Sequence, residues 1–211
     1  MNVGQAPAST VIAKLPSVAI AALLAVSLFL PWWGTEMESP QYHGEDKIVV
    51  SVYPGRVSGN LREVQTLNQY IGVRLPLDAA ELRALPWVLG AFLALAIVTI
   101  FLPESLQRKA LMANFVLMAT GGLAGAAMLQ FRLYALGHNR GHTILRGVPD
   151  FAPPIFGSMQ LANFHIETKL MAGGWAFGLA IALTGLAIYL SRQESARLPS
   201  TAQLRHAPAA K

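Results

Sequence analysis

The stretch LPWVLGAFLALAIVTIFLP (residues 85–103) contains no Asp, Glu, Lys or Arg. A helix needs about 20 mostly apolar residues to cross the hydrocarbon core of a bilayer. This stretch therefore predicts a transmembrane helix. Trp87, near its beginning, favours the membrane–water interface, where amphipathic aromatic rings gather.

Three more apolar runs share this character: LPSVAIAALLAVSLFLPWW (15–33), ALMANFVLMATGGLAGAAMLQF (110–131) and LMAGGWAFGLAIALTGLAIYL (170–190). The first could instead be a signal peptide, because Lys14 gives it a basic start. No small-x-small cleavage site follows it, so we expect an uncleaved anchor. The sequence thus predicts an all-α membrane protein with four transmembrane helices.

The composition supports the same class. Apolar residues make up 54% of the chain and charged residues 13%, and the mean hydropathy is +0.44, whereas a soluble domain carries about a quarter charged residues. The chain has no cysteine, which excludes disulfides and thiolate metal sites. Its Lys and Arg are scattered, with no basic run typical of nucleic-acid binding. We expect the lipid bilayer, and no nucleic acid, as a partner.

Basic residues near the apolar runs predict the orientation. Arg108 and Lys109 lie in the short link between the second and third of these runs along the chain, Lys14 precedes the first, and further Lys and Arg follow the last. Cytoplasmic loops next to membrane helices carry an excess of Lys and Arg. We therefore expect a multi-pass membrane protein with both termini in the cytoplasm.

This orientation divides the chain into cytoplasmic, membrane and outer segments. The C-terminal tail is polar and rich in Ala and Pro, which predicts disorder. The segments are a cytoplasmic N-terminus (1–14), transmembrane helices (15–33, 85–103, 110–131 and 170–190), outer loops (34–84 and 132–169), a cytoplasmic link (104–109) and a cytoplasmic tail (191–211).

The first outer loop has the pattern of a folded segment rather than a linker. KIVVSVYPG (47–55) alternates and is rich in β-branched residues, which predicts a strand, and Pro54-Gly55 predicts a turn into a returning strand. NLREVQTLNQYIG (60–72) has apolar residues at helical spacing, with Asn60 as the predicted N-cap. The loop therefore predicts a β-hairpin followed by a helix.

The second outer loop, GHNRGHTILRGVPDFAPPIFGSMQLANFHIE (137–167), is rich in Pro and Gly, and we expect it to be irregular. Its apolar residues, such as Phe156 and Phe164, would be exposed unless they pack against the first loop or the membrane surface. We therefore expect the two outer loops to form a small α+β extracytoplasmic cap over the four helices.

Residues of both loops resemble a family of small bacterial four-span membrane proteins. The stretch MESPQYHGED (37–46) carries the family's M-x-x-P-Q-Y pattern, which an L-N-x-Y-I-G pattern follows further along the loop. The second loop is similar to the family's F-x-P-P…G…A-N-F segment. The matching residues are Met37, Pro40, Gln41, Tyr42, Gly59, Glu63, Leu67, Asn68, Tyr70, Ile71, Gly72, Phe151, Pro153, Pro154, Gly157, Ala162, Asn163 and Phe164.

The resemblance implies a non-enzymatic accessory protein of copper-dependent respiration in the bacterial inner (plasma) membrane. It implies copper as the metal, and a respiratory metalloenzyme or a copper carrier as the partner. The chain departs from the family's N-H-Y-I-G-M pattern at Gln69 and Val73, where the family has His and Met. Imidazole and thioether groups are the donors that suit Cu(I), so these departures weaken a copper site in the predicted helix.

Five residues remain as candidate metal ligands. Met37 and His43 would form a soft Cu(I) site beside the membrane; alternatively, Met37 lies at the interface and His43 is solvated. His138, His142 and His165 would suit zinc or copper if the fold brings them together. The glycines around the first two of these histidines disfavour a helix that would place both on one face.

Four polar residues of the first loop form a second candidate set. They would either line a pocket for a ligand or, as we favour, hold the irregular loops together by hydrogen bonds. These residues are Gln41, Tyr42, Asn68 and Tyr70.

Two pairs of glycines have the small-x-x-x-small spacing that lets membrane helices approach closely. They are Gly121 with Gly125 and Gly174 with Gly178. We expect them to pack inside the bundle; a homodimer face is the alternative.

Two other function classes compete with an accessory role. The predicted spans contain no ionisable residue well inside them, which disfavours an ion transporter, so a transporter or binding protein for a lipid or apolar ligand is the alternative. No G-x-S-x-G, H-E-x-x-H or phosphate-loop motif is present, so we do not expect an enzyme.

Overall fold

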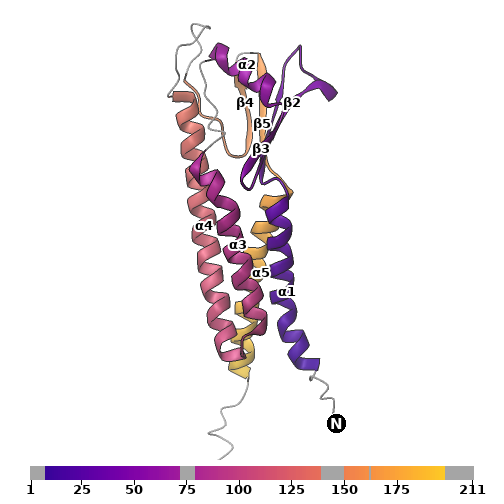
Figure 1. Ribbon diagram of the computed structural model, residues 1–211, viewed down its shortest axis with the longest axis vertical. Helices are drawn as coiled ribbons and strands as arrows, with labels where there is room; N and C mark the ends of the chain where they lie inside the picture. Colours follow the sequence, from indigo (N-terminus) through magenta and orange to yellow (C-terminus); the bar gives the residue numbers. More distant parts are fainter. Residues whose placement is uncertain (1–7, 72–78, 139–149, 162, 198–211) are drawn as a thin grey trace, which may run out of the picture.

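The computed structural model describes residues 8–71, 79–138, 150–161 and 163–197. It is an α+β structure, in which a long helical bundle carries a five-stranded antiparallel sheet at one end (Figure 1). The four bundle helices are α1 (Ala8–Phe29), α3 (Ala80–Phe101), α4 (Glu104–His138) and α5 (Ala172–Arg197).

The prediction of an all-α protein with four transmembrane helices is wrong. Within the described residues, three helices, α3, α4 and α5, are long and apolar enough to cross a membrane. The described apolar part of α1, Lys14–Phe29, is shorter than that. The helix ends at Phe29, and the chain enters strand β1 at Trp33. The five-stranded sheet also contradicts the prediction, because it makes the fold class α+β rather than all-α.

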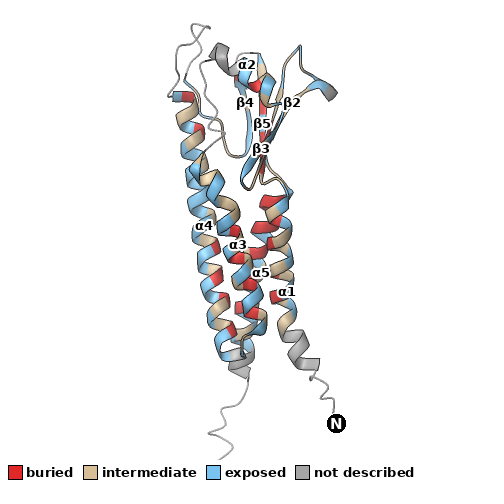
Figure 2. Ribbon diagram, viewed as in Figure 1, coloured by how far each residue is buried: buried red, intermediate tan, exposed pale blue. Residues whose placement is uncertain are grey.

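The bundle is built around an apolar core to which all four helices contribute. Its most deeply buried members include Leu24, Leu89, Met118 and Phe177. Large apolar side chains also cover the outside of the helices, and Figure 2 shows exposed residues along much of α3 and α4. Because water disfavours exposed apolar patches of this extent, the helices are compatible with a membrane protein.

Helix α4 is longer than its apolar run predicts. It covers the predicted link 104–109 and the first residues of the predicted loop 132–169. Its 35 residues give a length of about 50 Å at about 1.5 Å per residue, which exceeds the ~30 Å of a hydrocarbon core. In the upper part of α4, Arg132 Nε donates to Glu81 Oε1 of α3 at 2.5 Å.

The sheet interleaves segments from two distant parts of the chain. Its strand order is β3-β2-β1-β5-β4. Strand β1 lies in the centre, paired with β2 on one side and with β5 on the other. The strands are β1 (Trp33–Glu38), β2 (Ile48–Tyr53), β3 (Arg56–Gly59), β4 (Gly157–Leu161) and β5 (Phe164–Leu170).

The predicted hairpin is confirmed, since β2 and β3 pair in antiparallel fashion and Gly55 supplies the positive φ of the turn. The predicted helix is confirmed as α2 (Leu61–Ile71). The prediction that the second loop is irregular is wrong for the range 157–170, most of which forms β4 and β5. Strand β1 was also missed, because the range 33–38 was divided between an apolar run and a loop.

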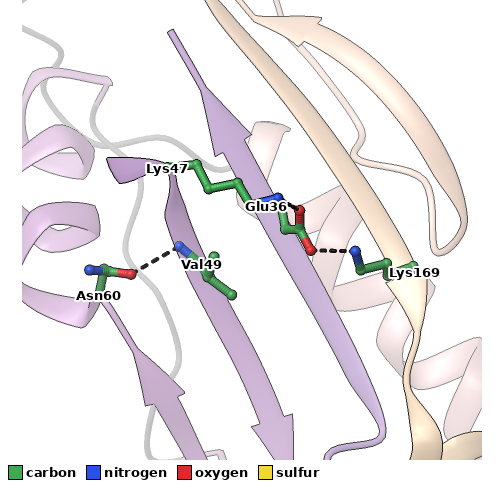
Figure 3. Close-up of polar contacts among 5 residues, drawn as sticks. All are labelled: Glu36, Lys47, Val49, Asn60 and Lys169. Atoms are coloured by element: carbon green, nitrogen blue, oxygen red, sulfur yellow. Dashed lines mark hydrogen bonds and ion pairs between the residues drawn. The ribbon is translucent and has the colours of Figure 1, made fainter. Parts of the chain in front are cut away.

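The start of α2 is tied to the sheet. Gly59 has a φ of +120° and brings Asn60 beside β2, where the Asn60 N–H donates to the Val49 carbonyl at 2.9 Å. The Asn60 side-chain oxygen in turn accepts from the Val49 N–H at 3.0 Å (Figure 3). The side chain predicted to cap the helix is therefore bonded to a strand.

The sheet has one apolar and one polar side, as the alternation of side chains along a strand requires. On the apolar side, Ile48 and Val50 of β2 pack with Val64 of α2, and Met37 lies against this group. We call β1–β5 together with α2 the cap.

The cap is joined directly to the bundle. Strand β1 follows α1 after a short link and β5 leads into α5. Backbone hydrogen bonds reinforce the junction: the Gly173 N–H donates to the Pro31 carbonyl at 2.8 Å and the Met171 N–H to the Trp32 carbonyl at 2.9 Å. The Trp33 indole donates to the Ile155 carbonyl at 2.8 Å. This hydrogen bond ties the segment before β4 to the start of β1.

Candidate functional site: the polar face of the sheet

The polar side of the sheet gathers charged residues from its central strands. In the strand register, Glu36 lies opposite Glu167, and Glu38 lies opposite His165. Gln160 of the edge strand β4 is the other neighbour of His165. We call this set, with Lys47 and Lys169, the polar face.

Glu36 is the centre of the polar face. Its two carboxylate oxygens form ion pairs with Lys47 and with Lys169 (Figure 3). The hydrogen bond from Lys169, and then that from Lys47, lowers the pKa of Glu36 below its ordinary value of 4.5. With 16% of its side chain exposed, Glu36 links β1, β5 and the start of β2 into one unit.

Beside this pairing lies a compact acidic patch. Glu38, His165 and Glu167 are all exposed, and so is Gln160. Directly opposed residues on antiparallel strands have their β-carbons about 5 Å apart, so the Glu38 carboxylate and the His165 imidazole are neighbours. The patch offers two carboxylates, an imidazole and an amide to a partner's hydrogen-bond donors and positive charges.

The candidate metal ligands are dispersed. Met37 pairs with Ile48 and Ile166 on the apolar side of the sheet, which is the side opposite His165. His43 is exposed at the start of a short 3₁₀ helix, η1 (Gly44–Asp46). In the described chain, no group of three or more His, Cys, Asp or Glu residues is arranged to hold a metal ion.

The remaining two histidines lie elsewhere. His138 is in the last turn of α4, where its ring stacks on Tyr134 with the centroids 3.8 Å apart. His142 lies outside the described residues, so the predicted site formed by three histidines stays a prediction.

The polar residues of the first loop divide between a turn and a helix. Ser39 and Tyr42 exchange backbone hydrogen bonds of 2.9 Å, which makes the turn that contains the exposed Gln41. The Tyr42 side chain packs against the apolar group under α2, as a structural role requires. Asn68 and Tyr70 are in α2, and their side chains lie outside the described part.

Only one glycine of each predicted pair packs closely within the chain. A β-carbon on Gly121 would lie 3.3 Å from the Phe92 ring, and one on Gly174 would lie 2.7 Å from the Trp32 carbonyl oxygen. Around Gly125 and Gly178, no described atom lies within 4 Å of that position. The expectation that these two glycines pack inside the bundle, with a homodimer face as the alternative, therefore stays a prediction.

The sequence pattern alone missed the residues that organise the polar face. Glu36 and Lys169 belong to the alternating segments WGTEME (33–38) and FHIETKL (164–170). That alternation was the signal that could have revealed two strands with a shared charged side. Their pairing could not be read from it, because the segments are far apart in the chain.

Comparison with protein-family models finds no match for this chain, and comparison with curated proteins finds no match either.

Proposed function

We propose that the protein is a non-enzymatic membrane accessory protein whose cap docks a partner through the polar face. The observation that carries the proposal is the contrast between the two sides of the sheet. One side is closed by α2, whereas the other presents Glu38, His165 and Glu167 to solvent.

Docking of this kind requires a surface that keeps its shape. The polar face has one, because its central strands continue into α1 and α5 and because Glu36 joins Lys47 to Lys169 across three segments. A preformed surface loses little conformational entropy when a partner binds. The exposed carboxylates favour a partner with a basic patch, since complementary charge raises the rate and the specificity of association.

The arrangement of the bundle supports the proposed location. Helix α1 begins and α5 ends at the end of the bundle away from the sheet (Figure 1). With the basic residues Arg108 and Lys109 near that end, the positive-inside rule supports a cytoplasmic position for the termini. The cap would then lie on the outer side of the bacterial inner membrane.

The resemblance of the two loops supports a respiratory metalloenzyme or a copper carrier as the partner. We place the metal on the partner, because the candidate ligands within the described residues lie on different faces and elements of the structure.

Affinity purification from the protein's own membranes tests this proposal. We expect a stoichiometric partner with the wild-type chain, and its loss when Glu38→Lys and Glu167→Lys are combined. The matched control is Arg192→Glu, an exposed charge reversal on α5, which should retain the partner. Reversing both carboxylates places like charges against a basic patch, so we expect affinity to fall by tenfold or more, about 1.4 kcal/mol.

Elemental mass spectrometry of the same preparations separates docking from metal handling. Docking predicts copper only in fractions that contain the partner. Copper retained at about one ion per chain in partner-free protein, and lost in His165→Ala, would make the chain itself a metal carrier.

A further inference from the structure

The half of the bundle that lies away from the sheet buries several polar side chains among the apolar ones of the core. Near the sheet, Trp32, Phe92 and Phe177 form an aromatic group, with ring centroids 4.8 and 6.3 Å from that of Phe177. Further along the helices the buried residues include polar ones from all four. These are Ser17 of α1, Thr99 of α3, Gln107 and Asn114 of α4, and Thr184 of α5.

Asn114 and Thr99 lie on the facing sides of α4 and α3, in the half of the bundle away from the sheet. The Phe92 ring of α3 lies against Gly121 of α4, at 3.3 Å from the position of a β-carbon. Asn114 precedes Gly121 by seven residues, and Thr99 follows Phe92 by seven. Because α3 and α4 run in opposite directions, two helical turns from this contact lead to Asn114 on one helix and Thr99 on the other.

Thr184 of α5 lies in the same half of the bundle. The Phe115 ring lies 3.2 Å from the β-carbon position of Gly185, and Asn114 and Thr184 are the residues next to these two in the chain. Asn114, Thr99 and Thr184 are all 0% exposed. We call these three residues the polar layer.

Hydrogen bonds to main-chain carbonyls use the hydroxyl protons of the two threonines, but the side-chain amide of Asn114 is not paired in this way. Thr99 Oγ1 donates to the Leu95 carbonyl and Thr184 Oγ1 to the Ala180 carbonyl, each at 2.7 Å. Neither Nδ2 nor Oδ1 of Asn114 has a hydrogen-bond partner among the described residues. A buried amide without partners is costly, and most such groups in native proteins are satisfied by protein or by ordered water.

We propose that the polar layer binds a fixed internal water molecule at Asn114. The water accepts a hydrogen bond from Nδ2 and donates one to a threonine hydroxyl, whose own proton is already used. Buried waters make about three such bonds to otherwise unsatisfied groups. Leu111 and Met118, one turn to either side of Asn114 and both buried, favour the smallest ligand.

The polar residues below the layer indicate how water reaches it. Gln107 Nε2 donates to Ser17 Oγ at 3.5 Å. Gln107 lies two turns from Asn114 on the same face of α4, toward the end of the bundle away from the sheet. Water would enter from that end, since the opposite half of the interior is aromatic.

X-ray radiolysis footprinting tests the site, because radicals formed from bound water oxidise buried side chains beside it. Met118 is 0% exposed and lies one turn from Asn114. We expect Met118 to be oxidised in the wild-type protein. The label should be lost in Asn114→Leu, which removes the amide and fills its space, and retained in Asn114→Ser, which leaves room and a hydroxyl.

Met112, exposed on the same helix, is the internal reference and should be oxidised equally in all three proteins. Unmodified Met118 in the wild-type protein would overturn the proposal, whether or not the variants fold. Equal oxidation of Met118 in folded Asn114→Leu would overturn it as well.

Discussion

The carbonyl oxygen of Phe151 lies so close to Gly137 that a β-carbon on Gly137 would be 1.6 Å from it. Gly137 is in the last turn of α4 and is buried. Phe151 lies in the segment that precedes β4, so this contact places that segment against the end of α4. Only a residue without a β-carbon permits so close an approach of two backbones.

Gly137→Ala should therefore destabilise the contact between the last turn of α4 and the segment before β4. Because the obstacle is backbone rather than a flexible side chain, we expect the free energy of unfolding to fall by about 1–3 kcal/mol. Thermal unfolding of the purified protein in detergent measures the effect as a lower Tm. Gly125→Ala in the same helix is the matched control and should leave the Tm unchanged or slightly raised, because alanine is the better helix former. Equal effects of the two substitutions would contradict the contact.

The junction between the cap and the bundle gives a second prediction. A β-carbon on Gly174 would meet the Trp32 carbonyl oxygen at 2.7 Å and the Leu170 side chain at 2.4 Å. We expect Gly174→Ala to lower the Tm by several degrees, consistent with about 1–2 kcal/mol in overpacked contacts. Gly178→Ala, one turn further along α5 at an exposed position, should be close to neutral. A large loss at Gly178 would show that this glycine packs against a second chain.

The Glu36 ion pairs predict a stability difference that depends on pH. The folded pKa of Glu36 lies below 4.5, so its contribution is present above that pH and is lost as the pH falls through the folded pKa. We expect Glu36→Gln to be less stable than wild type by about 1 kcal/mol at pH 7, and the difference to close well below pH 4.5. Thermal unfolding of both proteins at pH 7 and pH 3 measures it. The exposed Glu38→Gln is the control and should match wild type at both values; a Glu36→Gln difference that persists at pH 3 would refute the ion-pair account.

Local patterns were enough to predict the elements formed by neighbouring residues. The hairpin of β2 and β3 and the helix α2 were predicted because alternation, the Pro54-Gly55 turn and helical spacing are all signals within a short window. The apolar runs likewise located α3 and α5. The apolar runs did not locate either end of α4. Charged residues such as Arg108 and Arg132 interrupt a hydropathy run without ending the helix.

The candidate site depended on contacts that no local pattern contains. Strand β1 pairs with β5 across most of the chain length, so the partners of Glu36 and the opposite sides of Met37 and His165 follow only from the register. The metal hypothesis treated Met37 as a free thioether, whereas the structure packs it, partly buried, against the apolar group that includes Ile48. Asn114 was passed over because a polar residue near the end of an apolar run is unremarkable until α4 proves longer than that run.

The central claim, that the polar face docks a partner, is tested most directly by photo-crosslinking in intact membranes. A photoreactive amino acid at Gln160, beside His165 on β4, should give one discrete crosslinked product, and combining it with Glu38→Lys and Glu167→Lys should abolish that product. The same amino acid at Met128, exposed on α4, should give no product of that size. A Gln160 product that survives the charge reversal, or the absence of any product at Gln160, would contradict docking through this face.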